Sequence, residues 1–115
     1  MPIRGDVYLA SLVFPGDTKP LTKFIVALQS TPRAVPKYIA TVVASSDRRQ
    51  PGQTLRPYEV GVGAPEGFDH GTVIDCRWVF TLLHADVAAV TPTLHLSSEI
   101  MARVDLALFA GLQMR

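Results

Sequence analysis

The residues best suited to chemistry lie in one short polar segment of this 115-residue chain. Ser45 and Ser46 follow an apolar run, and the next residues along the chain are Asp47, Arg48 and Arg49. Hydroxyl groups followed by two arginines can hold a phosphate through short hydrogen bonds and charge. A solvated hairpin loop has the same kind of composition. The segment therefore indicates either a phosphate site or an ordinary polar loop.

Charge is unevenly distributed around this segment, although the net charge of the whole chain is only +1. Residues 19–56 contain seven basic residues and one acid, a balance of +6, whereas residues 57–115 have a balance of −4. The basic residues of the first stretch are Lys19, Lys23, Arg33, Lys37, Arg48, Arg49 and Arg56. A basic central third favours an anionic partner such as nucleic acid. Alternatively, these charges are balanced by neighbours on a solvated surface.

The remaining reactive side chains give weaker indications. The three histidines lie far apart in the sequence, so their spacing predicts no metal site. His70 follows Asp69 in a loop and could act as an acid or base near neutral pH, although a solvated loop histidine is the simpler interpretation. His95 is interpreted as a surface or hydrogen-bonded strand histidine. Cys76 is the single cysteine, which excludes an internal disulfide and a four-cysteine zinc site, and it is expected to be buried.

No phosphate loop, dinucleotide fingerprint or nucleophile elbow occurs in the sequence, and no cofactor is predicted. The length fits a single domain spanning residues 1–115. Apolar stretches such as 24–28 are too short to span a bilayer. The first residues contain no apolar signal-peptide core. The expectation is a cytoplasmic protein without a membrane segment.

The elements that must position the polar segment are mostly strands. Short apolar runs alternate with turn residues, which is the pattern of an all-β barrel or sandwich. The predicted strands cover residues 7–13, 23–29, 38–44, 57–62, 72–82 and 93–96. The fifth run is long enough for one bent strand or two short ones, so the prediction is six or seven strands. Ser45 to Arg56 is predicted as a loop between the third strand and the fourth.

The last segment changes to a helical period. Its apolar residues recur at three- and four-residue steps, at Ile100, Met101, Val104, Leu108 and Leu112. This spacing predicts a helix with these residues on one face. Ser97 is the predicted N-cap, and Leu96 is expected to pack against Met101 one turn later.

The order of these motifs resembles a known family. The chain opens on Arg-Gly-Asp-Val-Tyr at 4–8, followed by a Pro-Gly loop and an apolar strand ending in Gln29. Later come Ala-Ser-Ser at 44–46, Thr-Leu at 81–82 and a closing helical segment at 96–108. In this order and at this length, the motifs resemble those of the MazF/PemK toxin family, over essentially the whole chain.

The resemblance implies a mainly β (α+β) fold, an SH3-like β-barrel with a C-terminal helix, and a homodimer. It also implies a toxin of a type II toxin–antitoxin pair that cleaves single-stranded RNA without a metal. Family members use an arginine before the second strand and a Ser or Thr at the end of the third. Ser45 matches the hydroxyl position, whereas Thr22-Lys23 stands where the family has Arg-Pro. Lys23 or Lys19 could supply the charge, but not the planar fork of an arginine.

Three hypotheses follow from the residues and the resemblance. The first is an endoribonuclease in which Ser45 binds the scissile phosphate and Lys23 or Lys19 stabilises its charge. The residues expected to contact RNA are then Ser46, Arg48, Arg49, Arg33 and Lys37. The second is a catalytically impaired relative that binds RNA or a cognate antitoxin peptide. The third is a small structural domain that shares only the barrel.

Overall fold

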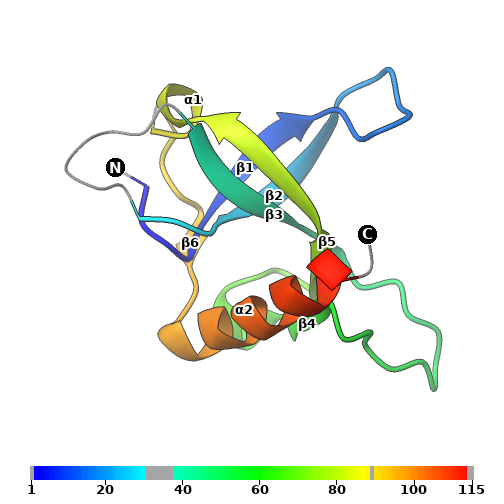
Figure 1. Ribbon diagram of the computed structural model, residues 1–115. Coiled ribbons are helices and arrows are strands. Elements are labelled where there is room, and N and C mark those ends of the chain that lie inside the picture. The colour runs from blue at the N-terminus through cyan, green and yellow to red at the C-terminus, as the bar shows by residue number, and fades with distance from the viewer. Residues whose placement is uncertain (1, 31–37, 89, 114–115) are drawn as a thin grey trace.

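Six strands form one curled antiparallel sheet in the computed structural model, which describes residues 2–30, 38–88 and 90–113 (Figure 1). The strands are β1 (Asp6–Leu12), β2 (Leu21–Ala27), β3 (Tyr38–Ser46), β4 (Glu59–Val62), β5 (Thr72–Leu83) and β6 (Leu94–His95). Their order in the sheet is β4-β5-β3-β2-β1-β6. Each of the six predicted runs overlaps one of these strands, so the mainly β prediction is confirmed.

Three helical segments accompany the sheet: a 3-10 turn (Ala64–Glu66), α1 (His84–Ala88) and α2 (Ser98–Gln113). Figure 1 shows α2 lying beside β4 and β5, with α1 at the opposite end of β5. The C-terminal helix was predicted, whereas α1 was not. In the described ranges, no helix is long and apolar enough to cross a membrane.

The apolar side chains divide between two cores because successive residues of a strand point to opposite faces. The first, the α2-side core, contains Val7, Val26, Val42, Ala44, Val60, Val62, Phe68, Ile74, Cys76, Leu96, Ile100, Met101, Val104 and Ala107. The second, the α1-side core, contains Tyr8, Leu12, Ile25, Ala27, Ile39, Val43 and Val87. Each helix thus covers a different part of the curled sheet.

Helix α2 begins as the sequence predicts. The backbone N–H of Ile100 donates a hydrogen bond to Ser97 Oγ at 3.2 Å, so Ser97 is the N-cap. Leu96 and Met101 both belong to the α2-side core, in agreement with the predicted contact. The prediction that Leu112 lies on the apolar face of the helix is wrong. Leu112 is 53% exposed, and Gly111 occupies the buried position of that turn.

Strand β5 bends where α2 packs against it. The register with β3 pairs Val42 with Val79 but Val43 with Asp75, so residues 76–78 form a bulge without partners in β3. A Cβ added at Gly111 would lie 2.4 Å from the carbonyl oxygen of Cys76. Only glycine allows the helix to approach this closely. Of the two alternatives for this run, the structure has one bent strand, and the prediction of a buried Cys76 is confirmed.

Arg4 ties the N-terminal turn to distant parts of the chain. Its guanidinium donates to the carbonyl oxygens of Leu28 and Met101 at 3.1 and 3.3 Å. It also forms an ion pair with Asp105 at 2.7 Å. We call these contacts the Arg4 clamp. They join α2 and Leu28, the residue after β2, to the first turn of the chain.

Asp6 anchors the same turn from inside. Its buried carboxylate accepts hydrogen bonds from the Ile3 N–H at 3.0 Å and the Tyr8 hydroxyl at 3.1 Å. His95 Nδ1 lies 2.8 Å from the other carboxylate oxygen. Gly5 between these groups has φ +97, and an added Cβ would lie 3.0 Å from the Leu96 carbonyl. The opening motif thus builds a structural turn, and His95 is a hydrogen-bonded strand histidine as predicted.

Candidate functional site

Ser45 and Ser46 end β3 between two hollows, and both serines line both of them. The larger hollow, the arginine pocket, has a volume of about 920 Å³ and is formed by residues 45–49, 52–57, Glu59, Val73, Asp75 and Arg77. The smaller one, the Lys23 cavity, has a volume of about 170 Å³. Its lining residues are Leu9, Thr22, Lys23, Phe24, Ala44, Ser45, Ser46, His70 and Thr72.

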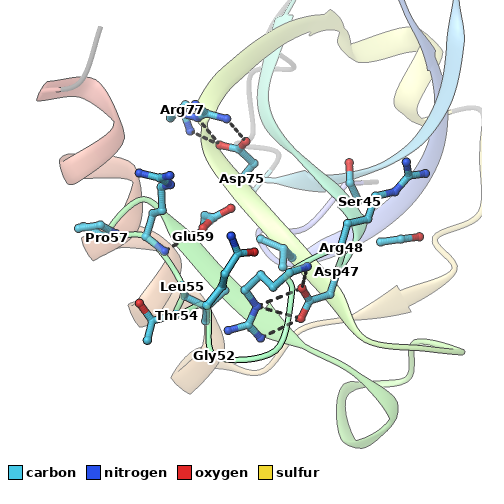
Figure 2. A pocket seen from close by; sticks show the side chains of 15 residues that line it. Ser45, Asp47, Arg48, Gly52, Thr54, Leu55, Pro57, Glu59, Asp75 and Arg77 are labelled. Carbon is cyan, nitrogen blue, oxygen red and sulfur yellow. Dashed lines mark hydrogen bonds and ion pairs between the residues drawn. The ribbon is translucent and has the colours of Figure 1, made fainter.

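In the arginine pocket, the loop that carries Gly52, Thr54 and Leu55 stands across from Asp47 and Arg48 (Figure 2). Arg49 donates to both carboxylate oxygens of Asp47, at 2.8 to 3.2 Å. These hydrogen bonds lower the pKa of Asp47 to about 2 and raise that of Arg49. The donors of Arg49 are therefore partly occupied.

A second ion pair lies on the β5 wall of this pocket. Arg77 Nη2 lies 2.9 Å from Asp75 Oδ2, and this hydrogen bonding raises the pKa of Arg77 (Figure 2). The guanidinium carbon of Arg77 also lies 4.4 Å from the centre of the Tyr58 ring, within cation–π distance. Asp75 and Tyr58 thus fix the orientation of this arginine.

The balance of charge in the pocket is smaller than the sequence stretch indicates. Its four arginines face Asp47, Glu59 and Asp75, a net +1. Strand β5 contributes Asp75 and Arg77, which pair with each other, so Glu59 of β4 is the acid from outside residues 19–56 that lowers the charge of this pocket. Among the described residues, the Arg48 and Arg56 side chains form no ion pair.

The Lys23 cavity brings together two of the predicted catalytic residues. Strands β2 and β3 are antiparallel neighbours, and their last pair at this end is Phe24 with Ala44. Lys23 and Ser45 are the next residue on each strand, and both line the cavity. Lys19 does not reach it, because it lies in the β1–β2 loop in a separate hollow with Asp17 and Thr18. The structure therefore places Lys23, rather than Lys19, beside Ser45.

His70 joins the same cavity from the loop before β5. Its Nε2 lies 2.8 Å from Ser46 Oγ. Thr72 Oγ1 donates to the His70 carbonyl at 3.0 Å, and the Asp47 N–H donates to the Gly71 carbonyl at 3.0 Å. These bonds hold the loop against the end of β3. From the sequence, His70 is a loop residue that could act as an acid or base, with a solvated histidine as the simpler interpretation. Its partner Ser46, 24 positions away, becomes visible only once β3 and β5 are paired.

No protein family and no curated protein matches the sequence, but solved structures match the fold. A mycobacterial endoribonuclease has a TM-score of 0.70 at 18% identity, covering 97% of this chain and 91% of that chain. A mycobacterial endoribonuclease in complex with its cognate antitoxin has a TM-score of 0.70 at 17% identity, covering 100% and 98%. The MazE–MazF complex from Deinococcus radiodurans has a TM-score of 0.69 at 16% identity, covering 99% and 98%. The chain has the MazF fold.

Within this MazF fold, the predicted site residues fall into four groups. Ser45, Ser46 and Lys23 meet at the Lys23 cavity, and Arg48 and Arg49 line the arginine pocket. Lys19 lies apart from both hollows. Arg33 and Lys37 lie outside the described residues. Among the described residues, no three metal-ligating side chains cluster.

Proposed function

We propose that this protein is a toxin of a type II toxin–antitoxin system, an endoribonuclease that cleaves single-stranded RNA without a metal. The observation that carries the proposal is the joint placement of Ser45 and Lys23 in one cavity beside the arginine pocket. The MazF fold supports it, because the solved structures that share this fold include endoribonucleases.

The proposed reaction is attack of a ribose 2′-hydroxyl on the adjacent phosphate. Negative charge grows on the phosphate oxygens in the transition state, so preorganised donors and cations aimed at them lower the barrier. Ser45 Oγ donates a hydrogen bond to one phosphate oxygen, and the Lys23 ammonium lies beside another. This lysine supplies the positive charge that a metal ion supplies in other nucleases.

The arginine pocket is proposed to hold the flanking backbone. Arg48 and Arg56 are the arginines there without an acidic partner among the described residues, so their guanidinium groups are available to phosphates. Arg49 contacts RNA only after exchanging part of its bonding to Asp47. Ser46 adds a hydroxyl between the two hollows.

The test is cleavage of a mixed-sequence RNA in EDTA by the wild type and four variants. Ser45→Ala and Lys23→Ala are each expected to lower kcat/KM by about 10²- to 10³-fold, the usual effect of removing one transition-state donor. Lys23→Arg is expected to retain activity because the charge stays in place. Lys19→Ala is the matched control, because its hollow is separate, and it should cleave like the wild type.

Two outcomes contradict this assignment. If the wild type in excess cleaves no RNA while an active endoribonuclease of this fold cleaves it in parallel, the protein is not an endoribonuclease. RNA binding without cleavage would instead support the RNA-binding module. If Lys19→Ala is as impaired as Lys23→Ala, the charge is not supplied by Lys23 alone.

We further propose that the protein binds a cognate antitoxin peptide and forms a homodimer. Solved structures with this fold include complexes with a cognate antitoxin. For the dimer, the support is the outer face of α2, where Leu106 is 75% and Phe109 is 65% exposed. Apolar side chains gathered on one face favour burial against a second protein surface. Light scattering should give twice the mass of the chain, and Phe109→Glu should shift it toward the monomer.

A further inference from the structure

The proposed cleavage still lacks a group that removes the proton from the 2′-hydroxyl. The hydroxyl of Ser45 is a poor proton acceptor, and a lysine side chain in water carries its own proton at neutral pH. A histidine is the side chain best matched to this task, because an imidazole ordinarily titrates near neutral pH. One histidine, His70, lines the Lys23 cavity.

The surroundings of His70 favour a role at the cavity. Its ring is exposed to solvent yet bonded through Nε2 to Ser46 Oγ, and its loop is held to the end of β3 by the hydrogen bond from the Asp47 N–H to the Gly71 carbonyl. A fixed histidine at an accessible site can meet a substrate without rearranging the chain. The bond links residues 46 and 70 across the β3–β5 edge, so strand pairing itself sets the position of the ring.

The charged groups around the imidazole are few. Lys23 from β2 is the other charged residue that lines the cavity. On its own loop, His70 follows Asp69, which is exposed and does not line the cavity. At the end of β3, Asp47 is engaged by Arg49. No carboxylate among the described residues lines the cavity beside the ring.

We propose that His70 is the general base of RNA cleavage and that Ser46 positions it, an inference that rests on the proposed function. Ser46 Oγ accepts a hydrogen bond from Nε2–H, which leaves Nδ1 as the unprotonated nitrogen. Nδ1 takes the proton of the 2′-hydroxyl while the 2′-oxygen forms a bond to phosphorus. The P–O5′ bond breaks, its electron pair stays on O5′, and solvent protonates that oxygen. The products are a 2′,3′-cyclic phosphate and a 5′-hydroxyl.

The experiment measures single-turnover cleavage of a short RNA from pH 5 to pH 9 by the full chain. For the wild type, the rate should rise with pH, because a general base acts only in its unprotonated form. His70→Gln can still donate to Ser46 but cannot act as a base. It should be slower by about 10²- to 10⁴-fold and lose that rise. His95→Gln makes the same exchange away from both hollows and should keep both rate and profile.

Two further variants separate a base from a structural role. His70→Ala should regain activity in added imidazole, in proportion to the unprotonated imidazole present. Ser46→Ala should be slower while the rise with pH persists, because the base is still there but less well oriented. Thermal unfolding of each variant shows whether a lost activity is a lost fold.

The outcomes distinguish this inference from the function on which it rests. If the wild type cleaves and His70→Gln cleaves at a similar rate with the same pH profile, His70 is not the base and the endoribonuclease assignment stands. Failure of imidazole to rescue a folded His70→Ala also contradicts the inference. A wild type that cleaves no RNA overturns both proposals.

Discussion

Ser45 and Ser46 are adjacent in the sequence but have different neighbours in space. Ser45 pairs with Val73 and lies beside Lys23 in its cavity, whereas Ser46 is bonded to His70. Both serines were predicted as site residues from the sequence, because an apolar run that ends in two hydroxyl side chains is visible without a structure. It did not predict the Ser46–His70 bond, because nothing local to either residue points to a partner 24 positions away.

Asp47 limits how Arg49 can bind RNA, because the two side chains are already paired. Asp47→Asn should release Arg49 for a phosphate. RNA should then bind more tightly, and the slope of log affinity against log salt should steepen by up to about one unit for each added phosphate contact. Fluorescence anisotropy of a 2′-O-methyl RNA, which lacks the attacking hydroxyl, measures both quantities without cleavage.

Asp17→Asn is the control for this change in net charge, because Asp17 lies in the separate hollow of the β1–β2 loop. If the two variants steepen the slope equally, the effect is one of total charge and Arg49 makes no new contact. The charge count of residues 19–56 includes both Asp47 and Arg49, but it does not show that their side chains pair.

Helix α2 and the bulge of β5 depend on each other. Gly111→Ala would place a methyl group 2.4 Å from the Cys76 carbonyl oxygen. Overpacking of this kind costs about 1–3 kcal/mol, while alanine in a helix recovers about 0.5–1 kcal/mol. We therefore expect a lower free energy of unfolding in urea. Gly16→Ala, at a position with open space around it, should show only the strain of its positive φ.

An unchanged or raised stability of Gly111→Ala would mean that α2 lies farther from β5 than this packing requires.

The same glycine explains an error in the prediction of helix α2. Hydrophobic periodicity placed Leu112 on the buried face, because a glycine gives no apolar signal. Helix α1 was not predicted, because five residues are too few to establish a helical period.

For the whole molecule, the Asp6 network links stability to alkaline pH. Burial and the neighbouring Asp6 carboxylate raise the pKa of Tyr8 to about 12. Its contribution to stability is therefore complete below the unfolded value of about 10 and is lost as pH rises through about 12. Burial also raises the pKa of Cys76 to about 12. This thiol therefore also reduces the stability of the fold as pH rises above about 9.

Tyr8→Phe isolates the tyrosine, because both proteins keep Cys76. At pH 7 the variant should be less stable by about 0.5–1.5 kcal/mol, the usual value of one hydrogen bond. Between pH 9.5 and 11.5 the difference should narrow, since only the wild type has this hydroxyl to deprotonate on unfolding. Urea unfolding at each pH gives the comparison, and a constant difference would contradict the linkage.

The overall architecture was the most predictable level. Alternating apolar runs and turns located all six strands, and the change of period located α2. The pairing order β4-β5-β3-β2-β1-β6 was not predicted from the residues, because strand partners depend on contacts between distant segments. That pairing creates both hollows, so the site residues could be named from the sequence more easily than their partners.

The Arg4 clamp also bears on the speed of unfolding. It joins Arg4 to Met101, which is 97 positions away in the chain, and to Asp105, which is 101 positions away. Closing a loop between residues so far apart costs conformational entropy before other native contacts can offset it. We expect such contacts to form after the folding transition state. The clamp would then govern how rarely the folded chain opens, and not how quickly it forms.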